Sequence, residues 1–180
     1  MRYLLFIFSF LFSANLFAGE LTIDEVKKKY NQAIYNSNEA KELDKLLSNQ
    51  KLQNNLMLAY YGATKGLLAK HASNPFNKLS YLDESLKHIN NAVNKEPNNI
   101  EIRYIRFTIQ SQIPEFVGKS KDFYTDKYFL INAVEKSKIS KSNKNQIEEI
   151  CEFLIEYGKC SPPEKNSLSS ILKNCKTPLI

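Results

Sequence analysis

Two arginines three residues apart are the side chains of this sequence best suited to holding an anion. Arg103 and Arg106 are the only arginines beyond residue 20, and lysine supplies every other positive charge there. A guanidinium group is a rigid fork of donors that matches a carboxylate or a phosphate better than an ammonium group does. A spacing of three residues also places both side chains on one side of a helix. The pair predicts either a site for an anion or a peptide carboxylate, or internal ion pairs with Glu101, Asp122 or Asp126.

The histidines and acids form no recognisable catalytic or metal-binding pattern. His71 and His88 belong to different predicted helices, with no third ligand at the spacing of a zinc site and no His-Glu-x-x-His motif. The sequence also contains neither a glycine-rich phosphate loop nor a nucleophile elbow. We therefore expect no metal, no cofactor and no catalytic residue. The exception would be a hydrolase in which acids distant in the sequence meet His71 in a cleft.

The first 18 residues have the pattern of a secretory signal peptide. A short start containing Arg2 is followed by a largely apolar block over residues 4–12, and the chain becomes small and polar before Ala18-Gly19. The apolar block is far shorter than the ~20 residues that a membrane-spanning helix needs. We expect cleavage after Ala18, export to the periplasm or the medium, and no transmembrane segment in the mature protein.

Export to an oxidising compartment makes a disulfide plausible for the cysteines at 151, 160 and 175. If residues 163–174 are helical they span about 18 Å, which is too far for a bond between Cys160 and Cys175. The same geometry disfavours Cys151 with Cys160. An antiparallel helical hairpin would bring Cys151 beside Cys175, so this pairing is the favoured one, and three free thiols are the alternative.

The composition indicates a helical protein with no nucleic-acid site. The chain has only 5 Gly, 6 Pro and no Trp, and it lacks long alternating runs of β-branched residues. Its formal net charge is +6 at pH 7, with lysines distributed among acids. We expect no nucleic-acid partner, although a weak attraction to anionic surfaces fits this charge. Residues 19–180 have the size of one domain.

Apolar residues recur at helical spacing along the whole of residues 19–180. A capping box at Thr22-Glu25 marks the first helix start, and Asn98 with Glu101 starts the fifth helix by the same capping logic. The segment Ser161-Pro-Pro-Glu164 begins the last helix. The third predicted helix has an unusually small face that would let a neighbouring backbone approach closely. Eight helices are expected; they begin near residues 22, 38, 50, 75, 98, 122, 142 and 162.

Four short segments give the chain a resemblance to a family of proteins. They are Tyr60-Tyr61-Gly62-Ala63, Ala69-Lys70-His71, Asn74-Pro75-Phe76-Asn77-Lys78-Leu79-Ser80-Tyr81 and the segment from Pro97 to Arg106. These segments resemble a family of uncharacterised exported bacterial proteins with a tetratricopeptide-like helical fold. Positions Ser85, Ile89, Ala92 and Pro97 also fit the second helix of a tetratricopeptide repeat, with Ile in place of an aromatic residue.

The expected architecture is therefore all-α, with stacked antiparallel helical hairpins that are degenerate tetratricopeptide-like repeats. Residues 60–134 would form the tetratricopeptide-like core, and residues 142–180 a C-terminal hairpin. Such proteins leave one surface free for a ligand. The leading hypothesis is a module that binds a peptide or protein partner in a groove between helices; a small exported hydrolase and a purely structural envelope protein are the alternatives. The residues expected in the groove are Tyr60, Tyr61, Lys65, Arg103 and Arg106.

Overall fold

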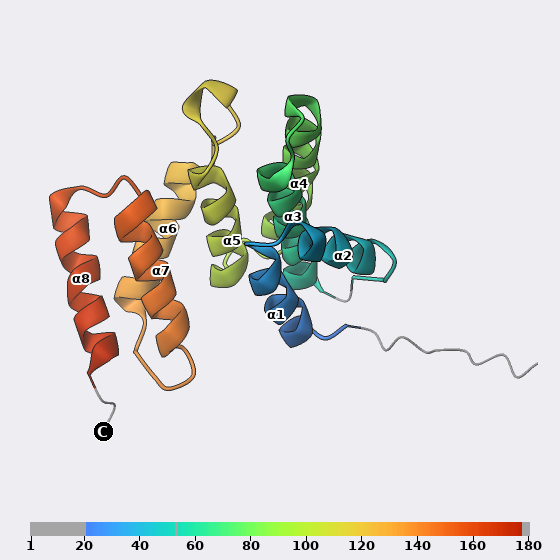
Figure 1. Cartoon of the computed structure of the whole chain (residues 1–180). Coiled ribbons are helices and arrows are strands. Elements are labelled where there is room, and N and C mark those ends of the chain that lie inside the picture. The colour runs from blue at the N-terminus through green and yellow to red at the C-terminus, as the bar shows by residue number, and fades with distance from the viewer. Residues whose placement is uncertain (1–20, 53, 178–180) are drawn as a thin grey trace, which may run out of the picture.

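The computed structural model describes residues 21–52 and 54–177, and all regular structure in these ranges is helical (Figure 1). The all-α prediction is confirmed for this part of the chain, which contains no strand. The predicted signal peptide at residues 1–18 lies outside the described residues. The helices are α1 (Ile23–Ala33), α2 (Ser37–Ser48), α3 (Asn55–His71), α4 (Pro75–Lys95), α5 (Ile100–Ser111), a 3₁₀ turn η1 (Glu115–Val117), α6 (Phe123–Lys136), α7 (Lys144–Tyr157) and α8 (Pro162–Lys176).

Side-chain caps fix most of the helix starts. Thr22 and Glu25 form the expected capping box of α1, and the structure shows a second capping box, of Ser161 with Glu164, at the start of α8. Helix α3 begins five residues later than the predicted Gln50. The reason is that Asn54 accepts a 2.8 Å hydrogen bond from the Met57 amide and caps the helix at that point.

Consecutive helices pair into four hairpins that stack along the molecule (Figure 1). The pairs are α1 with α2, α3 with α4, α5 with α6, and α7 with α8. The first helix of each hairpin contacts the first helix of the next, so α1, α3, α5 and α7 are neighbours in that order. Each of α3, α5 and α7 also contacts the second helix of the preceding hairpin. One side of the molecule is therefore built from the odd-numbered helices.

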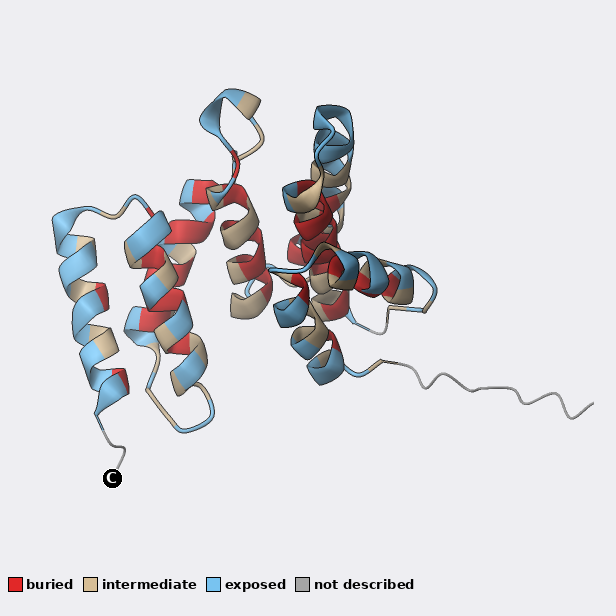
Figure 2. Ribbon diagram, in the orientation of Figure 1, coloured by how far each residue is buried: buried red, intermediate tan, exposed pale blue. Residues whose placement is uncertain are grey.

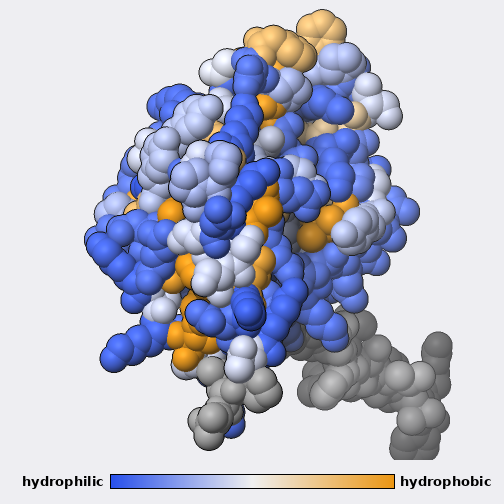
Figure 3. All heavy atoms as spheres, turned by 90° about the vertical axis from the view of Figure 1, so that its left-hand side faces the viewer, coloured by the Kyte–Doolittle hydropathy of each residue, from blue (hydrophilic) through white to orange (hydrophobic). Residues whose placement is uncertain are grey.

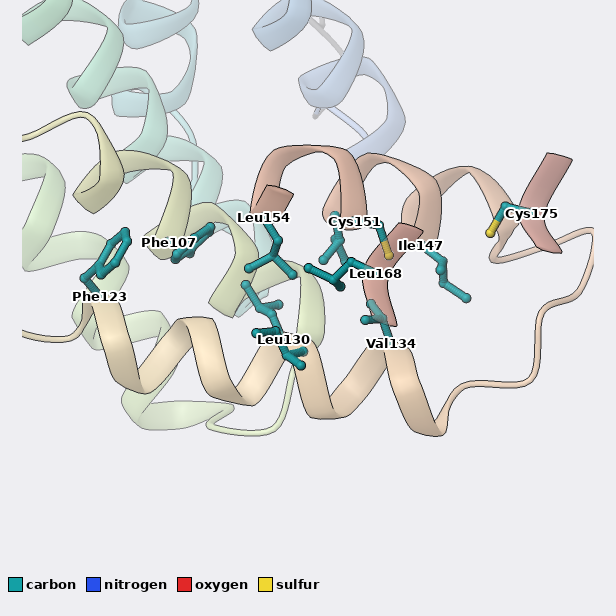
Figure 4. Packing of buried hydrophobic residues seen from close by; sticks show 11 residues of the cluster. Phe107, Phe123, Leu130, Val134, Ile147, Cys151, Leu154, Leu168 and Cys175 are labelled. Carbon is teal, nitrogen blue, oxygen red and sulfur yellow. The ribbon is translucent and has the colours of Figure 1, made fainter. Parts of the chain in front are cut away.

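Three hydrophobic clusters hold these contacts together, and buried residues follow the seams between helices (Figure 2). One cluster joins α1, α2 and α3, and a second joins α3, α4 and α5. The third joins α5 to α8, and Phe107, Leu130, Leu154 and Leu168 are fully buried in it (Figure 4). Because α3 and α5 each contribute to two clusters, the clusters form one continuous core. Within the described ranges, none of the helices is long and apolar enough to cross a membrane.

Candidate functional site

Arg103 and Arg106 point from α5 toward α6, where both meet the carboxylate of Asp126. Arg106 donates to the two oxygens of Asp126 at 2.7 and 2.9 Å, which is the bidentate geometry that guanidinium groups favour. Arg103 Nε lies 2.6 Å from Asp126 Oδ1. Asp126 is completely buried, and the arginines are 9% and 5% exposed. The arrangement is the internal ion pair that the sequence offered as an alternative to an anion site.

Two further donors of the arginine pair are also used within the protein. Arg106 donates to Asn90 Oδ1 at 3.1 Å and Arg103 donates to the Thr125 carbonyl at 3.2 Å. The Arg103 guanidinium also lies 4.4 Å from the centre of the Phe129 ring. Burial raises the pKa of the Asp126 carboxyl, and the two arginines oppose that rise. This cluster joins α5 to α6 and presents few free donors to a ligand.

Lys65 and Tyr61 lie on α3, and their side chains face α2 and α4. Lys65 Nζ is 2.8 Å from Asp44 and 3.1 Å from Glu84. Burial lowers the pKa of Lys65, but the hydrogen bonds to Asp44 and Glu84 outweigh it and raise the pKa above its ordinary value. The Tyr61 ring packs against His88, with 4.7 Å between ring centres. The five side chains expected in a groove therefore do not converge on one site.

Tyr60 is the only one of those five that joins a cluster on the side formed by the odd-numbered helices. We call this cluster the tyrosine–glutamate face. It takes at least one residue from each of the helices α1, α3, α5 and α7. Its members are Tyr30, Tyr60, Glu101, Tyr104, Glu149 and Phe153.

Hydrogen bonds connect the tyrosine hydroxyls of this face to its carboxylates. Tyr60 donates to Glu101 at 2.9 Å, and Lys27 donates to the other oxygen of Glu101 at 3.0 Å. Tyr104 donates to Glu149 at 3.2 Å. Each bond joins two different helices, so the face depends on the stacking of the hairpins.

The aromatic rings of the face continue from one helix to the next. Tyr30 meets Tyr60 edge to face at 5.4 Å between centres, and Tyr104 meets Phe153 in the same way at 5.8 Å. Phe153 in turn packs against Tyr157 at 4.6 Å. The face therefore combines aromatic surface with carboxylates, which is a combination suited to a cation.

The tyrosines of this face are held in their neutral form. Burial raises the pKa of Tyr30 to about 12, with a further contribution from the charge of Glu149. Burial likewise raises the pKa of Tyr60 and of Tyr104, and the neighbouring Glu101 and Glu149 respectively add to the rise. All three hydroxyls are therefore donors at neutral pH, and Glu149 acts on each of them.

An alkaline titration should reveal these three tyrosines. The unfolded chain loses its tyrosine protons near pH ~10, whereas the folded chain keeps those of Tyr30, Tyr60 and Tyr104 to higher pH. Above pH ~10 the unfolded state then binds fewer protons, so the free energy of unfolding should fall as the pH rises. The chain has 10 Tyr and no Trp, so phenolate absorbance reports the titration directly.

The matched variants for this titration are Tyr30→Phe and Tyr35→Phe. Tyr35 is 89% exposed, so Tyr35→Phe removes one phenol from the surface and serves as the control for Tyr30→Phe. Removal of Tyr30 should make the alkaline loss of stability shallower. All tyrosines titrating together near pH ~10 in the folded protein would contradict the assignment.

The histidines do not meet carboxylates at hydrogen-bonding distance in the part of the chain that the structure describes. His71 Nε2 lies 3.2 Å from the Ala33 carbonyl oxygen, and His88 packs on Tyr61. Residues 21–52 and 54–177 also contain no group of three or more His, Cys, Asp or Glu residues that could hold a metal ion. This geometry gives no support to the hydrolase alternative.

Two small depressions lie away from the tyrosine–glutamate face. One, of about 190 Å³, lies between α4 and the segment before α6, and it is lined in part by Asn90, Gln110 and Lys119. The other, of about 360 Å³, is lined in part by Asn54, Leu58 and Lys95. Neither includes any of the five residues that the sequence analysis singled out.

The cysteine thiols are unbonded in this structure, and two of them share a core. Cys151 in α7 and Cys175 in α8 are both buried in the cluster that joins α5 to α8 (Figure 4). Burial raises the pKa of Cys151 to about 12, and Cys175 adds to the rise. Cys160 instead donates to the Leu154 carbonyl at 3.3 Å. The proposed Cys151 to Cys175 pairing is not formed here, and it stays a prediction for oxidising conditions.

Comparisons of the chain with protein-family models, with curated proteins and with solved structures gave no match. The resemblance drawn from the sequence segments therefore stays a prediction, and the geometry alone carries the functional argument.

Proposed function

We propose that this protein is a binding module that holds an extended peptide segment rich in lysine or arginine against the tyrosine–glutamate face. The observation that carries the proposal is the convergence of three tyrosines, a phenylalanine and two glutamates from four stacked helices. Aromatic faces and carboxylates both attract cationic side chains.

The charge on α7 supports a cationic ligand. Glu149, Glu152 and Glu156 are exposed on this helix, one turn apart. Within the described residues, Glu149 and Glu156 have no basic partner at ion-pair distance, and Glu152 meets Lys176 only at 3.8 Å. These carboxylates are available to pair with a ligand, whereas Glu101 is already paired with Lys27.

The stacking of the hairpins supports a tetratricopeptide-like arrangement. The first helix of each hairpin contacts the first helix of the next, and also the second helix of the hairpin before it. In helical repeat proteins this packing leaves the side formed by the first helices open to an extended ligand. We propose the same use of that side here, in a protein exported through the signal peptide at residues 1–18, to the periplasm or the medium.

A peptide of alternating glycine and arginine, labelled for fluorescence anisotropy, tests the proposal. Replacing the exposed carboxylate by Glu149→Gln should weaken binding of this peptide about tenfold, since a hydrogen bond to a charged group contributes roughly 1.5 to 3 kcal/mol. The control is Glu42→Gln, which removes the same charge from the exposed surface of α2. Its affinity should match that of the unaltered protein.

A second peptide separates specific recognition from general stickiness. Alternating glycine and glutamate should show no binding, because it would bring carboxylates against carboxylates. The proposal fails if the acidic peptide binds as well as the basic one. It also fails if the two glutamine variants lose the same affinity.

A further inference from the structure

The end of α6, the start of α7 and the end of α8 lie at the lower end of the C-terminal helices in Figure 1, and six lysines occur there in the sequence. They come from the end of α6, the link to α7, the start of α7 and the end of α8. We call them the lysine end: Lys136, Lys138, Lys141, Lys144, Lys173 and Lys176. Four of the six lie within residues 136–144, which contain no acid, and the two α8 lysines join them because α7 and α8 pair.

The charges of the lysine end are largely unneutralised. All of its lysines are exposed except Lys144, which is half-buried. Among the described residues the only ion pair to them joins Lys176 to Glu152 at 3.8 Å. Glu135 and Glu148 lie on the neighbouring turns of α6 and α7, but no acid occurs in residues 136–147. The end therefore keeps a net positive charge.

The link between α6 and α7 holds its lysines in a defined position. Asn143 accepts hydrogen bonds from the Ser140 amide at 2.8 Å and from the Ser140 hydroxyl at 3.0 Å. It also donates to the Lys138 carbonyl at 3.0 Å. Ile139 packs against the hydrophobic core. With the backbone fixed in this way, Lys138 and Lys141 project outward from an ordered loop.

We infer that the lysine end attaches the protein to a membrane surface rich in anionic phospholipids. Each lysine close to such a surface attracts the negatively charged headgroups, and several lysines together give stable attachment. The lysines come from three helices and the link between two of them, and so cover the end of the molecule instead of following one helix. A spread of point charges matches a two-dimensional array of phosphates.

Other modes of association fit this end of the molecule less well. Residues 136–144 and 173–177 contain no arginine and no aromatic residue, which are the side chains that stack on nucleic-acid bases. The face bearing α8 is mostly hydrophilic, with hydrophobic atoms in small separate areas (Figure 3). Attachment by charge therefore suits it better than attachment through a broad apolar surface.

Sedimentation with phospholipid vesicles tests the inference. Vesicles containing phosphatidylglycerol are compared with neutral phosphatidylcholine vesicles, and the ratio of the two affinities is the readout. Contributions to binding that do not depend on the charge of the lipid cancel in this ratio. Replacing Lys138, Lys141 and Lys173 by glutamine should lower the ratio about a hundredfold, at about fivefold per lysine.

The control replaces three exposed lysines at the other end of the molecule. Lys28, Lys41 and Lys45 lie on α1 and α2, and their change to glutamine alters the net charge equally. Their replacement should leave the ratio nearly unchanged. Raising the salt from about 0.1 M to about 0.5 M should remove most of the preference of the unaltered protein for anionic vesicles.

Three results would overturn the inference. One is equal binding to anionic and neutral vesicles. Another is an equal loss of affinity in the two triple variants, which would make net charge alone responsible. The third is tighter binding to a single-stranded oligonucleotide than to anionic vesicles at the same phosphate concentration.

Discussion

Changing Asp126 to alanine is expected to lower the free energy of unfolding by about 3 to 5 kcal/mol. The change leaves Arg103 and Arg106 buried beside each other without the carboxylate that both contact. A buried charge that loses its partner cannot recover its hydration without opening the structure. Since a domain is commonly stable by only ~5 to 15 kcal/mol, much of the stability of this fold should be lost.

Urea unfolding followed by circular dichroism measures this effect, and an exposed ion pair provides the comparison. Asp83 pairs with Lys119 on the surface, where Asp83 is exposed and Lys119 is half-buried. Asp83→Ala should cost less than about 1 kcal/mol, because exposed pairs contribute little. Equal losses in the two variants would show that the Asp126 carboxylate is solvated in solution.

A triple replacement separates the missing charge from the missing volume. The variant combines Asp126→Leu with Arg103→Met and Arg106→Met. It removes all three charges while keeping apolar bulk between α5 and α6. Replacing a complete buried ion pair in this way is often neutral or stabilising. The triple variant should therefore recover most of the stability that Asp126→Ala loses. Continued instability would point to a packing role of Asp126 instead.

The sequence was sufficient for the helices because their starts and faces are set by local signals. The capping box at Thr22 lies where it was expected, and the last helix begins after Ser161 as predicted. The start of α3 was predicted too early because Leu52 continues the apolar pattern, whereas the cap at Asn54 decides where the backbone becomes helical. Local signals were therefore enough to predict the helices, and the errors concern the residues at which the helices begin.

The site could not be predicted in the same way because it depends on contacts between hairpins. The types and spacing of Arg103 and Arg106 allowed a ligand or an internal acid, and only the approach of α6 selects Asp126. Tyr104 and Glu149 are 45 residues apart and no local pattern joins them. At the lysine end the sequence shows the local run of residues 136–144, and only the return of α8 beside the start of α7 adds Lys173 and Lys176 to it. The stacking of the hairpins brings these distant residues together, and no short sequence motif predicts how the hairpins stack.

Close packing of α3 on α4 makes the stack sensitive to a single added methyl group at Gly62. A Cβ at Gly62 would lie 2.6 Å from Ile89 Cγ1 and 2.9 Å from the Ser85 carbonyl oxygen. Ile89 is fully buried and the Ser85 oxygen belongs to the backbone, so the two helices would have to separate. Gly62→Ala should lower the free energy of unfolding by about 1 to 3 kcal/mol, despite the better helix propensity of alanine.

Gly66, one turn further along α3, is the matched control for this substitution. A Cβ there would also lie 2.6 Å from a side-chain atom, but that atom is Cδ1 of Ile109, at the free end of a flexible chain. The next contact, Ser85 Oγ, is 3.3 Å away and also belongs to a side chain. Rotation of Ile109 can relieve the overlap, and alanine then gains about 0.5 to 1 kcal/mol over glycine in a helix. Gly66→Ala should therefore be nearly neutral in urea unfolding. If both alanine variants had the same stability, the approach of the two helices at Gly62 would be looser than the structure shows, and the close contact would not explain why glycine occupies that position.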